Sequence, residues 1–379
     1  MRFAFNEEQE ALRDSARRFL ADRASSQQTR AAMKLPQGYD PAVWRAIGEE
    51  LGWTAVVIPE EYGGFGFTYV ELVALMEEMG AALVCAPFLS SICLGANALL
   101  IGGTEAQRRA HLPGIASGET VATVALAEAG AGWEVGAPLS CRAQREGEDV
   151  VISGVKRYVP DGCAASLLLV AAQEEGGRTG LYILSPDAEG LTREALNTMD
   201  ETRPQAQLTL SGVRVPRAAR LGGEEADTEA ILASTMERAC IALAAEQVGL
   251  AQRCLDMSVE YAKVRVQFGR PIGSFQAVKH MCADMMLMVE SARSAAYFAG
   301  WAAAHSPEEV TEAAAVAKAY CSEAAFHCAS QNIQIHGGIG FSWEHDAHLY
   351  FKRARSSELL FGDPAAHKET LARQLGLQL

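Results

Sequence analysis

The chain has 379 residues, of which 49% are hydrophobic and 21% charged, and its formal net charge is −14. This length exceeds the ~100–200 residues of one ordinary core, and the composition is typical of a globular protein rather than a disordered one. The negative charge argues against nucleic acid or an anionic membrane surface as the main partner, because both would repel the chain.

The first residues turn acidic at Glu7 and contain no apolar run, so we expect neither a signal peptide nor an organelle-targeting segment. No stretch of ~18 uncharged apolar residues predicts a membrane span. A cytoplasmic location is therefore expected. The nine cysteines are an odd number without any CxxC pair, which favours reduced, mostly buried thiols over a disulfide framework or a metal site.

The first part of the chain has helical spacing. After Asn6, a predicted N-cap, apolar residues recur on one helical face behind an acidic first turn. Further helices are predicted at 41–51, 69–79 and 105–112, with a glycine-rich turn at 59–67. Residues 1–118 are therefore predicted to form a helical domain.

The composition changes after Pro113. Short runs of β-branched and aliphatic residues then alternate with glycine, proline and aspartate turns, which predicts strands. These runs are 121–127, 149–154, 166–172, 180–185 and 206–215. They define a predicted β-domain at 119–225.

The last part of the chain is alanine-rich and amphipathic. Its predicted helices are 227–264, 274–304, 308–331 and 344–371, separated by glycine or proline. They define a predicted helical domain at 226–379. The expected fold class is α+β, mainly α.

Two motifs lie at turns of this last part. Residues 265–276 read RVQFGRPIGSFQ, where Arg265 can pair with a phosphate and Gly269 permits close backbone approach. Residues 334–341 read QIHGGIGF, whose glycines leave room for a cofactor and whose helix amides can face an anion. Taken alone, the first motif is more typical of a surface turn, and the second fits an ordinary inter-helix turn equally well.

Together the two motifs resemble the acyl-CoA dehydrogenase family, and the resemblance runs almost end to end. It also includes, in the family's order and spacing, PEEYGGFG at 59–66, ALAEAGAG at 125–132, SGVKRYVPDG at 153–162, VRVP at 213–216 and AEQVGLAQRCLD at 245–256. The resemblance implies an N-terminal helical domain, a central β-barrel-like domain and a C-terminal four-helix bundle, assembled into dimers or tetramers. It also implies FAD at the subunit interface, an acyl-CoA thioester substrate and electron-transfer flavoprotein as a partner.

In this family, residues of a neighbouring subunit hold the adenine and pyrophosphate half of FAD. We call the matching positions of this chain the adenine-end set: Arg265, Phe268, Gln334, Gly337 and Gly338. All five are of the residue types that the resemblance implies.

The positions implied for the flavin ring depart from the family. Leu126 and Ala127 stand where the family offers a hydroxyl to the ring, and Trp133 replaces a serine near the thioester. Tyr158 replaces a tryptophan that faces the ring, and Pro160 replaces a threonine. Tyrosine can still stack, but proline has neither a hydroxyl nor a backbone N–H to donate. We call Leu126, Ala127, Tyr158 and Pro160 the ring-end set.

The implied catalytic base is also altered. The family removes the substrate's α proton with a carboxylate, usually a glutamate that precedes a glycine near the C-terminus. Aligning that glycine with Gly362 places Phe361 at the base position, and phenylalanine cannot accept a proton. Phe361 and Trp133 are instead expected to shape the substrate pocket.

Other carboxylates could serve as the base. Glu237, just before an arginine, resembles the base of family members that carry it on an earlier helix, but it lies two residues too far from Gly249. Two residues rotate a side chain by ~200° about a helix. Asp363 has a shorter reach and also fits a helix N-cap ahead of a proline. Glu246, within an apolar helical face, is predicted to make a structural hydrogen bond.

The half of the FAD site that serves a neighbour is thus as expected, whereas the half that serves the chain's own active site is changed. This pattern favours one subunit of a heteromeric acyl-CoA dehydrogenase, resembling those that act on steroid or other bulky acyl groups. Three alternatives are a self-sufficient homo-oligomer that uses Glu237 or Asp363, a flavin-dependent oxidase or monooxygenase, and a non-catalytic scaffold subunit without flavin. The sequence does not define the acyl group.

Overall fold

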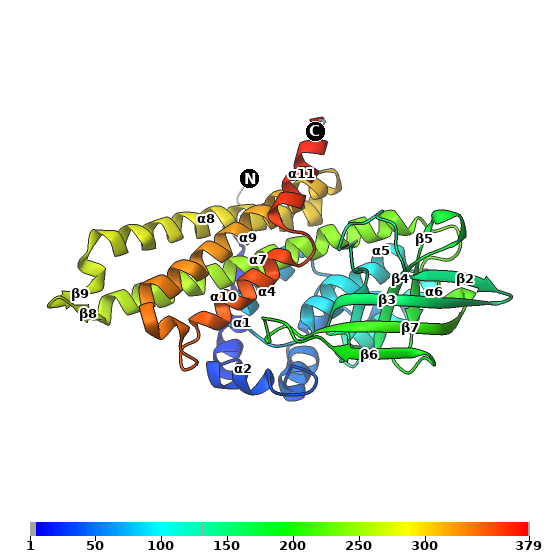
Figure 1. The fold of residues 1–379 in the computed structure, drawn as a ribbon, viewed down its shortest axis with the longest axis horizontal. Coiled ribbons are helices and arrows are strands. Elements are labelled where there is room, and N and C mark those ends of the chain that lie inside the picture. The colour runs from blue at the N-terminus through cyan, green and yellow to red at the C-terminus, as the bar shows by residue number, and fades with distance from the viewer. Residues whose placement is uncertain (1–4, 131, 378–379) are drawn as a thin grey trace. The chain divides into compact units, whose positions relative to one another are not determined.

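The computed structural model describes residues 5–130 and 132–377 (Figure 1). Residues 1–4, which belong to the expected absence of a targeting segment, and residue 131 of the ALAEAGAG motif lie outside this range. Residue contacts divide the chain into two compact units. The helical unit contains the described residues up to Ala31, Tyr69–Val84 and Cys240 onward, and the sheet unit contains Ala32–Thr68 and Cys85–Ala239.

The helical unit is built from long helices that pack lengthwise. Its helices are α1 (Glu7–Arg23), α2 (Ser26–Ala32), α4 (Tyr69–Ala81), α7 (Thr228–Val264, from Cys240 onward), α8 (Gln276–His305), α9 (Val310–His336), α10 (Ala347–Leu359) and α11 (Pro364–Gln374). A short hairpin of β8 (Val266–Gln267) and β9 (Arg270–Pro271) joins α7 to α8. The α9 helix packs against α8, α10 and α11, and its many buried alanines permit this close approach (Figure 1).

The predicted helix at 344–371 is wrong in one respect, because it is interrupted. The α10 helix ends at Leu359 and α11 begins at Pro364. Between them Phe361 and Gly362 have φ angles of +63° and +100°, which an α-helix does not contain. The Asp363 carboxylate then caps α11 by accepting a bond from the backbone N–H three residues later (2.9 Å). The remaining predicted long helices are present.

The sheet unit contains one seven-stranded mixed sheet. Its strands are β1 (Ala122–Ala125), β2 (Arg142–Glu146), β3 (Asp149–Pro160), β4 (Leu167–Gln173), β5 (Thr179–Leu184), β6 (Leu191–Ala195) and β7 (Gln205–Pro216). They are ordered β1-β4-β2-β3-β7-β6, with β5 paired to β4 (Figure 1). The unit also contains α3 (Pro41–Arg45), α5 (Asn97–Gly102), α6 (Glu105–Ala116) and the first turns of α7.

Composition explains where the sheet is covered. The β4 strand reads LLLVAAQ and is buried at every position but its last, as expected when an aliphatic run lacks alternation. The predicted fold class, α+β and mainly α, is confirmed. The domain boundaries predicted at 118/119 and 225/226 stay a prediction. Within 5–130 and 132–377, no helix is long and apolar enough to cross a membrane.

The cysteines agree with the prediction of mostly buried thiols. All nine are free, and all are buried except Cys163 and Cys282, which are half-buried. They therefore contribute to packing as small apolar side chains.

Candidate functional site

The two motifs that carry the adenine-end set lie together in the helical unit. The first forms the end of α7 and the β8–β9 hairpin, and the second forms the end of α9 and the turn after it. The ring of Tyr261, one helical turn before Arg265, stacks on His336, which directly precedes Gly337; the ring centroids are 4.3 Å apart. Sequence reasoning missed this stack, which joins the two motifs.

The adenine-end set is open to solvent. Phe268 is 91% exposed, and Arg265 and Gln334 are exposed as well. A Cβ placed on Gly337 would meet no atom within 4 Å, and this glycine has φ +63° and ψ −140°, a conformation that other residues rarely adopt. A guanidinium, an exposed aromatic ring and an open glycine backbone fit the phosphate and base of a dinucleotide.

The ring-end set lies in the sheet unit, where the end of β1 adjoins the end of β3. The backbone N–H of Arg157 donates to the carbonyl of Ala127 (2.9 Å), and Thr123 Oγ1 donates to the carbonyl of Pro160 (2.7 Å). Tyr158 is 46% exposed and has φ +54°, at an irregularity in the β3–β7 register. The fold therefore brings the ring-end residues together, but Pro160 provides no hydrogen-bond donor.

A buried ion pair supports this part of the sheet unit. Lys156 Nζ donates to Glu128 Oε1 (2.6 Å) and to the carbonyl of Leu126 (3.1 Å), and both charged side chains are almost fully buried. The Glu128 carboxylate also accepts bonds from the backbone N–H groups of Ser140 and Cys141. Burial raises the pKa of Glu128, but the hydrogen bond and charge of Lys156 outweigh it and lower that pKa. The sequence analysis did not single out this pair.

The base position lies in the loop between α10 and α11. Phe361 is only 4% exposed, and its carbonyl is 3.1 Å from His367 Nε2. Lys318 Nζ donates to the carbonyl of Gly362 (3.0 Å) and to that of Glu358 (3.1 Å). Internal donors thus hold the carbonyls of this loop.

Burial governs the titration of both donors. It lowers the pKa of Lys318 to about 8. Burial, together with the nearby charge of Lys318, lowers the pKa of His367 to about 4. Both changes follow from the cost of placing a charge in a site that water hardly reaches.

The three carboxylates considered as bases have different surroundings. Asp363 is exposed and caps α11, as the alternative prediction for it stated. Glu246 is buried and accepts a hydrogen bond from Arg353 Nη1 (2.8 Å), which confirms its structural role. Glu237 is half-buried on the first turns of α7, in the sheet unit. Trp133 is half-buried, just after the ALAEAGAG turn.

Comparison with known proteins places these features in a family. Family profiles match residues 6–119 as the N-terminal domain and residues 230–376 as the C-terminal domain of acyl-CoA dehydrogenase. The acyl-CoA dehydrogenase IpdE2 of Mycobacterium tuberculosis is 36% identical over 367 residues, which are 97% of this chain and 96% of that protein. The chain belongs to the acyl-CoA dehydrogenase family.

Solved structures of the family have the same fold. The ChsE4–ChsE5 complex of Mycobacterium tuberculosis contains a chain with a TM-score of 0.89 and 29% identity, and the match covers both chains completely. A chain of the steroid acyl-CoA dehydrogenase Tcur3481–Tcur3483 has a TM-score of 0.87 and 32% identity over 98% of each chain. Acyl-CoA dehydrogenases are flavoprotein oxidoreductases that act on CH–CH bonds, and this chain is a member of that class.

Proposed function

We propose that the chain is one subunit of a hetero-oligomeric acyl-CoA dehydrogenase, whose homologous partner subunit supplies the catalytic base. The reaction is the α,β-dehydrogenation of an acyl-CoA thioester, with steroid-derived or other bulky acyl groups as the expected class. The observation that carries this proposal is Phe361, a buried phenylalanine at the position where the family has its carboxylate. The neighbouring Asp363 carboxylate is engaged in capping α11.

The chain's residues fit one end of FAD better than the other. When bound, FAD supplies the electron acceptor for the dehydrogenation. In the adenine-end set, Arg265 would pair with the pyrophosphate, Phe268 would pack against the adenosine, and the glycines would admit the cofactor to the backbone. In the ring-end set, Tyr158 would stack, whereas Pro160 could donate no bond to the flavin ring.

Two solved structures support a hetero-oligomer. ChsE4–ChsE5 is described as a complex, and Tcur3481–Tcur3483 as a steroid acyl-CoA dehydrogenase with two components. Exposed cofactor-binding residues on one chain are useful only when another chain completes the site. Electron-transfer flavoprotein is the proposed acceptor of the electrons, and the cytoplasm is the proposed location.

The test compares the chain alone with the chain co-expressed with a homologous subunit from a neighbouring reading frame. FAD per chain is measured from the visible spectrum, and flavin bleaching is measured anaerobically with a panel of acyl-CoA thioesters. We expect poor flavin occupancy and no bleaching for the chain alone, and both properties in the complex.

Other outcomes would identify the alternatives. About one FAD per chain with bleaching by the chain alone would contradict the proposal, and loss of that bleaching in Glu237→Gln or Asp363→Asn would identify the base. Oxygen consumption without another acceptor would indicate an oxidase or monooxygenase. A co-expressed complex in which neither chain holds flavin would indicate a scaffold.

A further inference from the structure

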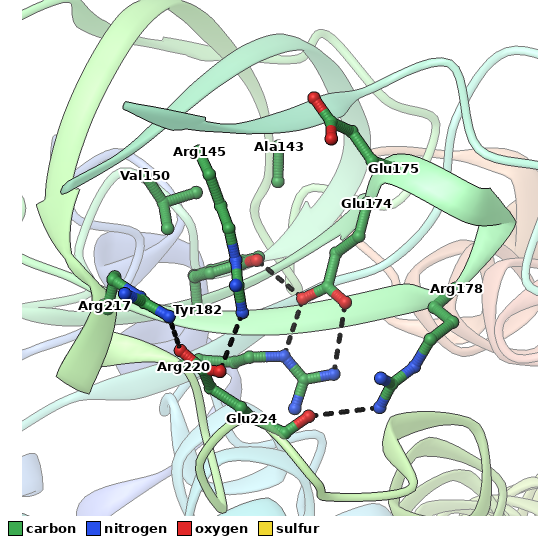
Figure 2. A pocket seen from close by; sticks show the side chains of 10 residues that line it. All are labelled: Ala143, Arg145, Val150, Glu174, Glu175, Arg178, Tyr182, Arg217, Arg220 and Glu224. Carbon is green, nitrogen blue, oxygen red and sulfur yellow. Dashed lines mark hydrogen bonds and ion pairs between the residues drawn. The ribbon is translucent and has the colours of Figure 1, made fainter. Parts of the chain in front are cut away.

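A polar cavity of about 280 Å³ lies in the sheet unit and has no role in the proposed reaction. Figure 2 shows its charged side chains, which come from β2, from the β4–β5 hairpin and from the segment that precedes α7. Four arginines and three glutamates line it, so the cavity has an excess of positive charge in a chain whose net charge is −14.

One wall of the cavity is electrically balanced. Arg220, whose side chain is only 5% exposed, pairs with Glu174 through its Nε (2.6 Å), and the hydroxyl of Tyr182 donates to the same carboxylate (2.7 Å). Burial raises the pKa of Glu174, but the hydrogen bonds from Arg220 and Tyr182 outweigh it and lower that pKa. This wall is therefore fixed and has no charge left for a ligand.

The other three arginines converge on a single residue, Glu224 (Figure 2). Arg145 and Arg217 each pair with its carboxylate, Arg145 at 2.9 Å, and Arg178 donates to its backbone carbonyl (3.1 Å). The Nε of Arg217 is buried and has no hydrogen-bond partner among the described residues. One carboxylate thus serves three guanidinium groups and leaves a buried donor unused.

Glu224 itself is held weakly. Its side chain is 42% exposed, and ion pairs at that exposure contribute little to stability. It follows Gly222 and Gly223, whose φ angles are +72° and +82°, so it extends from a turn. An external anion could therefore displace it from the arginines without disturbing the sheet.

We propose that this cavity binds a phosphoryl group and that the Glu224 carboxylate occupies the ligand's place when no ligand is bound. A phosphoryl dianion has three acceptor oxygens and matches converging guanidinium groups, which bind phosphate in a planar, two-pronged geometry. It would use the unpaired Nε of Arg217 and neutralise the excess charge. The inference does not depend on which subunit supplies the catalytic base.

The test is calorimetric titration of the full-length chain, in the oligomer in which it purifies, at constant ionic strength. The probes are inorganic phosphate, pyrophosphate and 3′,5′-ADP. Glu224→Gln removes the competing carboxylate and is expected to tighten binding at least about tenfold. Arg217→Gln, made in the Glu224→Gln background, is expected to weaken binding at least about tenfold.

The matched control is Glu146→Gln. Glu146 pairs with Arg214 on the same sheet but does not line the cavity, and its substitution changes the net charge equally. We expect it to leave phosphate binding unchanged. Equal affinities for Glu224→Gln and Glu146→Gln would overturn the proposal, as would binding that Arg217→Gln leaves intact.

The probes also distinguish two sources of the phosphoryl group. Tight binding of 3′,5′-ADP that an acyl-CoA thioester displaces would assign the cavity to the nucleotide end of a coenzyme A ester. Binding of phosphate and pyrophosphate that the thioester does not displace would assign it to a free phosphate. Failure of the proposed dehydrogenation would affect neither result.

Discussion

The adenine-end and ring-end sets differ in how their polar groups are used. In the adenine-end set, Phe268 and Arg265 are exposed, and the glycine backbone faces open space. In the ring-end set, the carbonyls of Leu126, Ala127 and Pro160 all accept hydrogen bonds within the unit. The first set is therefore available to a ligand and a second chain, whereas the second set stabilises the fold that contains it.

The largest effect is expected when the support of the ring end is broken. Lys156→Met would leave the buried Glu128 carboxylate without its cation, which costs about 3–5 kcal/mol of unfolding free energy. Urea unfolding of the purified chain measures this. The control is Lys368→Met, because Lys368 pairs with Glu323 on the exposed surface and should cost at most about 1 kcal/mol. Similar losses in both variants would contradict the structural role of the ring end.

At the adenine end we expect the opposite behaviour. Arg265→Ala should leave unfolding unchanged but weaken FAD binding by about 10- to 100-fold in the co-expressed complex, because a charge-assisted bond to phosphate is lost. Flavin retained after dialysis measures this. The control is Arg270→Ala in the same hairpin, whose guanidinium lies over the ring of Phe275 at 4.2 Å. If both variants retain equal flavin, Arg265 does not bind the cofactor.

The base-position loop resembles the ring end, because internal donors hold its backbone. Since the pKa of His367 is lowered to about 4, the unfolded chain gains a proton as pH falls below ~6.5, whereas the folded chain does not until pH reaches about 4. The unfolding free energy should therefore fall by about 1–3 kcal/mol through this histidine between these pH values.

Comparison of variants isolates this effect. His367→Gln should remove that part of the pH dependence, and substitution of the exposed His305 by Gln should not. Unfolding in urea at pH 7.5 and pH 5 gives the difference for each protein. An unchanged pH dependence in His367→Gln would show that other groups determine the acid sensitivity.

Local signals predicted much of this molecule. The long helices and the strand runs followed from apolar periodicity and from glycine and proline at the turns. The break before α11 was missed, although Gly362 and Pro364 were both visible, because the amphipathic pattern continues across them. The adenine-end set was recognised because its residues stand in two short motifs.

Features that depend on distant residues were not predictable in this way. The stack of Tyr261 on His336 joins two helices, and the cavity around Glu224 gathers arginines from three segments. No spacing in the sequence relates such residues, because tertiary packing alone brings them together. The same reason explains why the buried carbonyl bonds of the ring end had no signal in the sequence.

The smallest effect tests whether the ring end can be turned back toward a ligand. Pro160→Thr would provide a hydroxyl and a backbone N–H that proline lacks, while Thr123 could still donate to the carbonyl of residue 160. We expect flavin occupancy of the isolated chain to rise only a few-fold, because one hydrogen bond contributes about 0.5–1.5 kcal/mol. Pro160→Ala restores the N–H alone and separates the two donors. If Pro160→Thr and Pro160→Ala both behave as the unaltered chain does, the missing donor does not limit flavin binding, and the altered base position alone distinguishes this subunit from a self-sufficient dehydrogenase.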